Sequence, residues 1–382
     1  MNDESIVILS SDDWGWKTSK YQLSVRFSRR NRVLFVSSIG FRPPTASRSD
    51  AGRMLRKLGA FLRGPRKVQD NVWVLTPLVV PFGRGSMVRR LNRLLFRLQY
   101  AAALRILRLR SPYLFVFSPN WRTYVPGLRR RKLIYYCVDE QSGFKGVNED
   151  LFRRWDDDLT RQADHVFCSA YALWSSKQKL NPATHYMPHG VNWRHFAGAV
   201  TGEGTRPVPE LEGLAGPILL FFGHISHDWV DTDLVCWLAG QRPEWHIVLA
   251  GRSAIDEAEF AACPNVHLIG EREYDELPSL CACAAVGIIP FVESPLTAAC
   301  NPLKLYEYLA AGLPVVSTEI PEVRRAPGAA RVAATPAAFL RACEDALRVD
   351  RGRYGPEASA SVREHDWDRR VEQIYSLVAA SP

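Results

Sequence analysis

Residues 290–317 read PFVESPLTAACNPLKLYEYLAAGLPVVS and carry the clearest indication of the fold of this chain. This stretch reads as the end of one strand, a loop, a helix over 302–311 and a second strand. We expect Asn301 to cap the helix, Pro302 to lie in its first turn and Gly312 to end it. A strand, a helix and another strand in this order are typical of a parallel α/β layer.

The same alternation of short apolar runs and longer amphipathic runs extends along the chain. In the first half we predict strands at 5–10, 33–38, 72–77, 113–118, 132–138, 165–169 and 184–187, with helices at 18–30, 87–110 and 149–163. In the second half we predict strands at 217–222, 246–250, 266–269, 286–291 and 314–317, with helices at 229–240, 275–283, 302–311, 336–347 and 361–378. The sequence therefore predicts an α/β protein with two Rossmann-like, doubly wound domains that face a cleft.

Composition places the domain boundaries. Residues 197–216 are rich in Gly and Pro and read as a linker between a first domain, 1–196, and a second, 217–360. We expect the C-terminal helix, 361–382, to pack back on the first domain. Apolar residues make up 47% of the chain and charged residues 23%, which excludes a disordered protein.

Charge divides the chain near the same place. Residues 1–200 carry 34 Lys and Arg against 14 Asp and Glu, whereas residues 201–382 carry 15 against 26. Within residues 51–132 there are 19 basic residues and one acid, Asp70. This asymmetry predicts an anionic partner for the first half.

Missing motifs exclude several enzyme classes. The first strand is followed by SSDDWGW and not by GxGxxG, and no GxxxxGK[ST] occurs, which excludes typical dehydrogenases and P-loop NTPases. The eight Cys form no CxxC pair and the nine His no HxxxH pair, so we expect buried thiols and no metal site. Three strings, Asp156–Asp158, Asp231–Asp233 and Asp366–Asp368, resemble a metal-binding DxD, but helix caps and solvated helix faces explain them better.

The helix at 302–311 carries the chemistry that we assign first. Its N-terminus offers free N–H groups and the positive end of a dipole, and Lys304 adds a cation in the first turn. Glu307 lies on the same face and can accept hydrogen bonds from two neighbouring sugar hydroxyls. A cation for phosphate and a carboxylate for ribose suit a nucleoside diphosphate. A surface ion pair on an ordinary amphipathic helix fits the same spacing.

Five stretches resemble the group 1 glycosyltransferases of the GT-B fold, and within them the branch that builds teichuronic acid and similar bacterial surface polysaccharides from UDP-sugars. They are YYCVDEQSGF (135–144), MPHGVNWRHF (187–196), FFGHISHDW (221–229), LPSLCACAAVGIIPF (277–291) and the stretch 290–317, which follows the family pattern P-x-K-x-x-E-[YA]-x-A-x-G-x-P-V-V. The likeness is strong in the second half and weaker before residue 130. It implies that the first domain binds the acceptor and the second binds the nucleotide sugar.

The resemblance also implies roles for single residues. Glu307 would hold the donor ribose, and Lys304 would contact the diphosphate or the donor sugar. We assign further donor contacts to Gly223, His224, Arg252, Asn301 and Leu303, and acceptor contacts to Trp14, Trp16 and Lys17.

Asp139 is the residue that we assign to catalysis. It follows the strand YYCV and is similar to the Asp of a Y-x-x-S-D-G segment, which acts as the base in inverting enzymes that transfer glucuronic acid. An Asp that caps the following loop is an equally good interpretation.

Two departures from the retaining members matter. Ala299 stands where those members carry a second Glu, and Gly223 is followed by His-Ile-Ser in place of an Arg/Lys pair. The common retaining mechanism is therefore not implied intact. We assign Arg252, after the strand HIVLAG, as a substitute for the missing positive charge.

Two basic runs, 53–67 and 87–110, together carry 13 Lys and Arg and no acidic residue. In the second run Arg89, Arg93 and Arg97 share one face, and Leu91, Leu94, Leu95, Leu98 and Ala102 share another. We expect the leucine face to pack on the sheet and the arginines to lie in water. The summed charge favours an anionic membrane surface or a polyphosphate as the partner. Nucleic acid is disfavoured, because the basic runs lack the interleaved aromatic residues of a base-stacking surface.

The sequence thus predicts a metal-independent hexosyl- or glucuronosyltransferase that needs no cofactor besides its UDP-sugar donor. Its acceptor would be lipid-linked or a polysaccharide. The acidic N-terminus and the absence of long apolar runs predict an intracellular protein. The basic charge of the first half adds the expectation that it lies at the inner face of the cytoplasmic membrane. Two alternatives stay open: a UDP-sugar epimerase of the same fold, and a polyanion-binding protein with a vestigial nucleotide domain.

Overall fold

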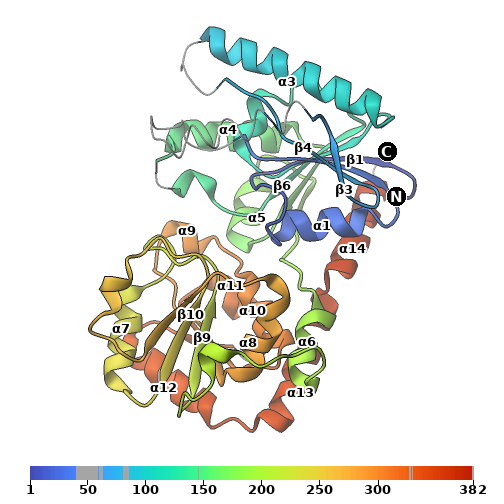
Figure 1. Cartoon of the computed structure of the whole chain (residues 1–382). Helices are drawn as coiled ribbons and strands as arrows, with labels where there is room; N and C mark the ends of the chain where they lie inside the picture. The colour runs from blue at the N-terminus through green and yellow to red at the C-terminus, as the bar shows by residue number, and fades with distance from the viewer. Residues whose placement is uncertain are drawn as a thin grey trace. The chain divides into compact units, whose positions relative to one another are not determined.

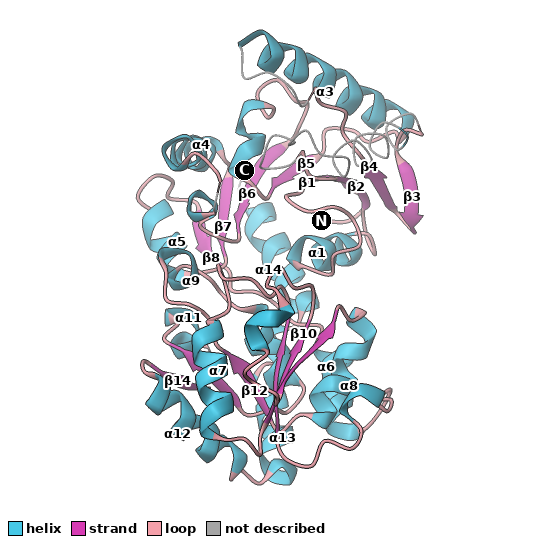
Figure 2. Ribbon diagram, turned by 60° about the vertical axis from the view of Figure 1, so that its left-hand side comes forward, coloured by secondary structure: helices cyan, strands magenta, loops and turns pink. Residues whose placement is uncertain are grey.

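The computed structural model describes residues 1–39, 63–80, 86–144, 146–326 and 330–380, together with Gly59 and Gly328. The chain divides into two compact units. Unit 1 comprises Met1–Pro188 and Val371–Pro382, and unit 2 comprises His189–Arg370. Each unit has its own sheet with helices on its faces (Figure 1; Figure 2). The predicted α/β fold with two doubly wound sheets is confirmed.

The sheet of unit 1 has the strand order β3-β4-β2-β1-β5-β6-β7-β8. Its strands are β1 (Ser5–Leu9), β2 (Arg32–Val36), β3 (Arg66–Gln69), β4 (Val72–Leu75), β5 (Tyr113–Val116), β6 (Lys132–Cys137), β7 (His165–Cys168) and β8 (Thr184–Tyr186). All neighbours pair in parallel except β3, which is antiparallel to β4. The strand order reverses at β1, which pairs with β2 on one side and β5 on the other. The carboxyl end of β1 is therefore the switch point, where open α/β sheets bind ligands.

Helices α1 (Ser19–Phe27), α3 (Ser86–Ile106), α4 (Glu149–Gln162) and α5 (Tyr171–Lys177) belong to unit 1. The C-terminal helix α14 (Trp367–Ala380) begins in unit 2, and its later residues belong to unit 1. There Tyr375 stacks on Phe27, with ring centroids 5.6 Å apart, and its hydroxyl accepts a 2.8 Å hydrogen bond from the Asn31 amide.

Among the described residues, no helix combines the length and the apolar composition that a membrane crossing requires.

The sheet of unit 2 is all parallel, in the order β11-β10-β9-β12-β13-β14. Its strands are β9 (Ile218–Phe222), β10 (His246–Ala250), β11 (Val266–Gly270), β12 (Val286–Ile289), β13 (Val315–Thr318) and β14 (Arg331–Ala333). The helices are α6 (Trp193–Thr201), α7 (Thr232–Gln241), α8 (Leu277–Cys283), α9 (Pro295–Ala298), α10 (Leu303–Ala310), α11 (Pro321–Arg325), α12 (Pro336–Leu347) and α13 (Arg351–Ser361). Helices α6, α8, α10 and α13 pack together, and α7 packs with α12 (Figure 1). The switch point of this sheet lies between β9 and β12.

The chain passes from unit 1 to unit 2 after Pro188. The segment 197–216, which we read as a linker, holds the end of α6 and a 3₁₀ turn at Pro209–Leu211, both within unit 2. Two edge strands, β3 and β14, were not expected. Strand β3 reads Arg-Lys-Val-Gln and its first two residues are exposed, so it lacks the apolar alternation that marks a strand.

Helix α3 packs by a different face from the one that we expected. Its buried face consists of Asn92, Phe96, Tyr100, Ala103 and Leu104, whereas Leu91, Leu94 and Leu98 are 45%, 55% and 60% exposed. Phe96 explains the choice, because its ring lies 5.2 Å from the buried ring of Trp121 and also packs on Tyr124. An aromatic face buries more apolar area than the leucine face would.

The Asp156–Asp158 string on α4 is not a uniformly solvated face, as we had expected. Asp156 is largely buried, forms an ion pair with Lys177 and accepts a hydrogen bond from the Tyr135 hydroxyl. Only Asp157 and Asp158 are exposed enough to pair with surface arginines. The buried pair ties α4 to α5 and, through Tyr135, to strand β6.

Replacing Asp156 by Asn should lower the free energy of unfolding of unit 1 by about 3 kcal/mol, because the buried Lys177 ammonium loses its only ion-pair partner among the described residues. Urea unfolding monitored by circular dichroism measures this change. The matched control is Asp157→Asn on the same helix, where an exposed ion pair is lost and less than about 1 kcal/mol is expected. Equal effects of the two substitutions would contradict the structural role of the buried pair.

Candidate functional site

Two glycines shape the carboxyl end of the sheet in unit 2. Gly223 follows β9 with φ +136°, and Gly251 follows β10 with φ +148°. A Cβ atom on Gly251 would lie 1.8 Å from the carbonyl oxygen of Gly223, so the two backbones approach as closely as glycine permits. The Gly223 N–H donates a 2.8 Å hydrogen bond to the Ala250 carbonyl and fixes this contact.

Lys304, in the first turn of α10, lies directly at Gly223. A Cβ on Gly223 would meet the Lys304 Cε at 2.6 Å and the Nζ at 2.7 Å. The ammonium also lies 5.0 Å from the ring of Phe221 and 5.3 Å from the ring of Phe291, where the aromatic faces attract a cation. Burial lowers the pKa of Lys304, while Glu307 acts in the opposite direction. No described residue forms an ion pair with this cation, so its charge is available to an anion.

Glu307 lies one turn further along α10 and is half-buried. Its carboxyl group has no hydrogen-bond or ion-pair partner among the described residues. Burial raises the pKa of Glu307 to about 7, although the nearby Lys304 lowers it. A half-buried carboxylate without a partner is an acceptor held ready for a ligand.

Asn301 does not cap α10, contrary to our expectation. Its side chain is buried, and its amide donates hydrogen bonds to Glu322 at 3.0 Å and to the Tyr306 hydroxyl at 3.2 Å. The cap position is occupied by Pro302, which makes no side-chain hydrogen bond to the helix. The N–H groups of the first turn therefore lack a side-chain partner and can meet an anion. Asn301 instead fixes the entry to the helix.

The remaining predicted donor residues lie around the same edge of the sheet. His224 and Arg252 follow the two glycines and are both exposed, and the His224 Nδ1 lies 3.2 Å from the Arg252 carbonyl oxygen. Leu303 is the first residue of α10 and is half-buried. The structure thus brings Gly223, Lys304, His224 and Arg252 to the carboxyl ends of β9 and β10.

Asp139 follows β6 in unit 1 and is half-buried. Burial raises the pKa of this carboxyl group, with Lys20 acting against the shift and Asp12 adding to it. The side chain makes no hydrogen bond to the following loop or to any other described residue. The structure therefore shows no cap at this position.

Asp12 and Lys20 are polar groups beside Asp139 that we did not predict. Asp12 accepts a 2.9 Å hydrogen bond from the Thr18 hydroxyl and pairs with Lys20 at 3.2 Å. Both follow the central strand β1, so the switch point of unit 1 carries two carboxylates and one ammonium. The sequence carries a signal for Asp12, since this residue stands three positions after the strand SIVIL, whose last four residues are apolar and buried.

The three predicted acceptor residues lie in the loop between β1 and α1. Trp14 packs on Tyr21 and Phe35, with ring centroids 4.8 and 5.2 Å away. Trp16 is 47% exposed. Lys17 lies over the Tyr21 ring at 4.1 Å and donates a 2.8 Å hydrogen bond to its hydroxyl. This loop therefore presents one exposed indole and one cation to solvent.

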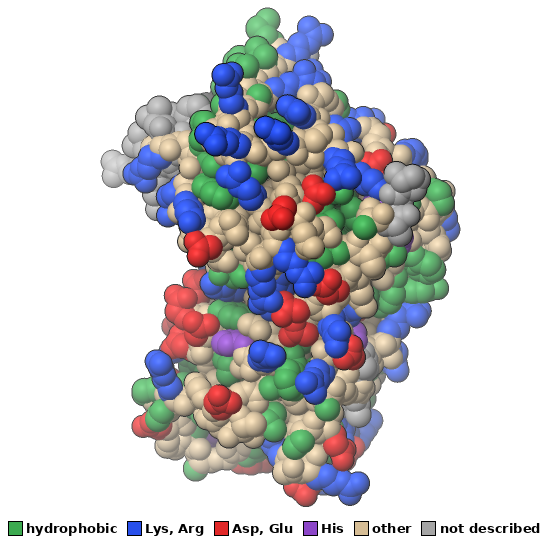
Figure 3. All heavy atoms as spheres, turned by 90° about the vertical axis from the view of Figure 1, so that its right-hand side faces the viewer, with side chains coloured by type: hydrophobic (Ala, Val, Ile, Leu, Met, Phe, Trp, Pro, Cys, Tyr) green, Lys and Arg blue, Asp and Glu red, His purple; other side chains and the backbone are tan. Residues whose placement is uncertain are grey.

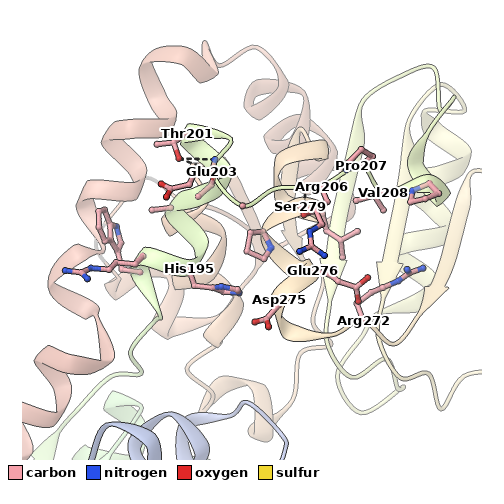
Figure 4. Close-up of a pocket in the computed structure, with 18 of the residues that line it drawn as sticks. His195, Thr201, Glu203, Arg206, Pro207, Val208, Arg272, Asp275, Glu276 and Ser279 are labelled. Atoms are coloured by element: carbon pink, nitrogen blue, oxygen red, sulfur yellow. Dashed lines mark hydrogen bonds between the residues drawn. The ribbon is translucent and has the colours of Figure 1, made fainter. Parts of the chain in front are cut away.

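A pocket of about 900 Å³ in unit 2 lies apart from these groups. Figure 4 shows that its labelled residues come from two segments, 195–208 and 272–279. Arg272 pairs there with Glu210 at 2.6 Å, and the His195 ring stacks on Tyr274 at 4.7 Å. None of the predicted donor residues lines this pocket.

The predicted DxD caps are confirmed at two of the three strings. Asp231 accepts a 2.9 Å hydrogen bond from the Leu234 N–H and caps α7, and Asp366 accepts a 2.8 Å bond from the Asp368 N–H at the start of α14. Across the described part of the chain, no three His, Cys, Asp or Glu side chains are grouped as metal ligands.

Comparison with known proteins shows what the chain resembles. Residues 216–348 match the family model "Glycosyl transferases group 1". A curated Bacillus subtilis protein, "Putative teichuronic acid biosynthesis glycosyltransferase TuaH", is 29% identical over 236 residues. That match covers 56% of this chain, and the chain spans little more than half, 57%, of the relative's length.

Solved structures agree over nearly the whole chain. Sucrose-phosphate synthase from Thermosynechococcus elongatus superposes with a TM-score of 0.71 at 13% identity, covering 99% of this chain and 100% of that one. The α,α-trehalose 6-phosphate synthase of Burkholderia multivorans gives 0.69 at 13%, with both chains fully covered. HepE from Anabaena, solved in complex with UDP and glucose, gives 0.65 at 12%, again over both full chains. These likenesses establish the GT-B fold for the chain.

The raised pKa of Glu307 makes the stability of the folded protein depend on pH. The folded state binds the Glu307 proton more tightly than the unfolded state does, so this group's contribution to stability falls as the pH rises from about 4.5 to about 7. Glu307→Gln removes that loss. The variant should be more stable than the wild type by about 1–3 kcal/mol at pH 8 and no more stable at pH 4. Thermal unfolding at pH 4 and at pH 8 measures the stability of the variant relative to the wild type. The same relative stability at both pH values would contradict the raised pKa of Glu307.

Proposed function

We propose that this chain, which has the GT-B fold, is a group 1 glycosyltransferase that transfers a sugar from a UDP-sugar to a hydroxyl group of a lipid-linked or polysaccharide acceptor. The teichuronic acid name of the curated relative supports an acceptor of this class. HepE has been solved with UDP and with UDP-glucose, which supports a uridine nucleotide donor. The proposed sugar is a hexose or a glucuronic acid.

The observation that carries the proposal is the arrangement of Gly223, Lys304 and Glu307 at the end of β9. The bare backbone at Gly223 lets a diphosphate approach the sheet edge. Lys304 and the free N–H groups of α10 neutralise the charge that builds up on the leaving nucleoside diphosphate. Glu307 accepts hydrogen bonds from the two ribose hydroxyls. His224 and Arg252 line the same edge, and in this scheme the leaving group departs without a metal ion.

Asp139 is the proposed catalytic base. Burial raises the pKa of Asp139 toward neutral pH, and a carboxylate with a raised pKa is a more effective proton acceptor. It takes the proton of the acceptor hydroxyl while that oxygen attacks the anomeric carbon and the bond from this carbon to the diphosphate breaks. The configuration at the anomeric carbon is thereby inverted. Trp14, Trp16 and Lys17 contact the acceptor in this scheme.

The donor assignment is tested by calorimetric titration of UDP. Glu307→Ala should weaken UDP binding by about 10- to 150-fold, because two ribose hydroxyls lose a charged acceptor worth about 1.5–3 kcal/mol. In the wild type the affinity should also fall from pH 8 to pH 6, as Glu307 takes up its proton. The control is Glu357→Ala, an exposed residue on α13. A Glu307→Ala protein that is folded and binds UDP like the wild type would refute this placement.

The catalytic assignment is tested by Asp139→Asn, which keeps the shape of the side chain and removes its basicity. Turnover should fall by about 10²–10⁴-fold while the affinity for UDP changes little. The anomeric configuration of the product, read by NMR, should be inverted relative to the donor. A product that retains the donor's configuration would overturn the assignment, and an isomerised UDP-sugar formed without an acceptor would show an epimerase instead.

A further inference from the structure

Helix α3 presents a second apolar row on the side opposite its packed face. Met87, Leu91, Leu94, Leu98 and Ile106 are 81%, 45%, 55%, 60% and 66% exposed. Their spacing of three, four or eight residues places them along one side of an α-helix. Nine large hydrophobic side chains are exposed in the described part of the chain, and these five form the majority. These five side chains therefore form one exposed apolar row on α3, unlike the single exposed hydrophobic residues that are common on protein surfaces.

The surroundings of this row are strongly basic. Between Asp70 and Asp139 the sequence contains 13 Lys and Arg and no acidic residue. Within α3, Arg90, Arg93 and Arg105 are exposed and have no ion-pair partner among the described residues. Figure 1 places α3 at the outside of unit 1, and Figure 3 shows Lys and Arg side chains gathered with apolar ones over this unit.

A pocket of about 640 Å³ lies at the C-terminal end of the same helix. Five arginines and no acidic residue line it: Arg97, Arg105, Arg108, Arg110 and Arg129. The Arg97 guanidinium donates a 2.6 Å hydrogen bond to the Pro126 carbonyl, which fixes one wall. The Tyr100 hydroxyl donates a 2.9 Å bond to the Arg129 carbonyl and ties the loop to the helix. A lining with five arginines and no carboxylate suits a phosphate group, whose oxygens accept hydrogen bonds from guanidinium groups.

We propose that the α3 surface, defined as the apolar row with this arginine pocket, docks on an anionic lipid bilayer. The apolar side chains enter the boundary between headgroups and acyl chains, and the arginines hold lipid phosphates. A single partner contacts both the apolar row and the arginine pocket only if it offers an apolar interior next to negatively charged groups. An anionic bilayer offers both. A nucleic acid would leave the leucines in water and finds no row of exposed aromatic rings on α3. This docking does not depend on the proposed transfer reaction.

The test is co-flotation of the full chain with vesicles of phosphatidylcholine, alone or mixed with phosphatidylglycerol. The wild type should bind only the mixed vesicles, and binding should weaken as salt rises from roughly 0.1 to 0.5 M. Leu94→Asn/Leu98→Asn should weaken binding more than about tenfold, because two apolar side chains are lost from the lipid. The matched control, Leu151→Asn, removes an exposed leucine of α4 and should bind like the wild type.

A second pair of substitutions tests the arginine pocket in the same vesicle experiment. Arg105→Gln/Arg108→Gln should reduce binding to the mixed vesicles and flatten its salt dependence. Unfolding midpoints that match the wild type show that the variants are folded. Three outcomes would overturn the proposal: mixed-vesicle binding that survives the leucine substitutions, equal binding to neutral vesicles, or binding of duplex DNA or inorganic phosphate by the pocket with no binding to vesicles. UDP titration of the same variants should be unchanged, so a failure here is distinct from a failure of the donor site.

Discussion

The contact between the backbones of Gly223 and Gly251 is the constraint on which the site of unit 2 depends. A single Cβ on either residue would strike backbone or the Lys304 side chain. Because both positions have positive φ and no side chain, the ends of β9 and β10 stay open, and α10 can bring its first turn up to the sheet edge. The switch point then gathers a cation, free N–H groups and a carboxylate within one helical turn. Glycine at these two positions is thus a geometric requirement of the site.

The charged groups of the protein fall into two kinds. The Asp156–Lys177 pair is buried and fully partnered, and it holds helices of unit 1 together. Lys304, Glu307 and Asp139 are half-buried and have no ion-pair partner among the described residues. Burial lowers the pKa of Lys304 and raises the pKa of Glu307 and Asp139, so each shift favours the uncharged form. Leaving a charge unpaired in such surroundings costs stability. Groups that carry this cost are typical of functional sites, where a ligand supplies the missing partner.

Sequence patterns predicted the helix α10 and all strands of both sheets except the edge strands β3 and β14, because buried parallel strands read as apolar runs. These patterns failed where the local sequence is equally compatible with two structures. Asn301 has the side chain of a helix cap, but its amide is bound to Glu322, which lies twenty-one residues further along the chain. Helix α3 has two apolar stripes, and periodicity alone does not tell which one meets the sheet; the contact of Phe96 with Trp121 decides it. Asp156 looked like its exposed neighbours because Lys177, its partner, comes from another helix.

We propose that the edge formed by Gly223, Lys304 and Glu307 binds a nucleoside diphosphate. A crystal structure of the chain with UDP tests this most directly, because it reports the position of each ligand group. We expect the diphosphate at the first turn of α10 beside the Lys304 ammonium, and both ribose hydroxyls within hydrogen-bond distance of the Glu307 carboxylate. UDP bound instead in the pocket lined by His195 and Arg272, with Glu307 still unpartnered, would contradict this donor site.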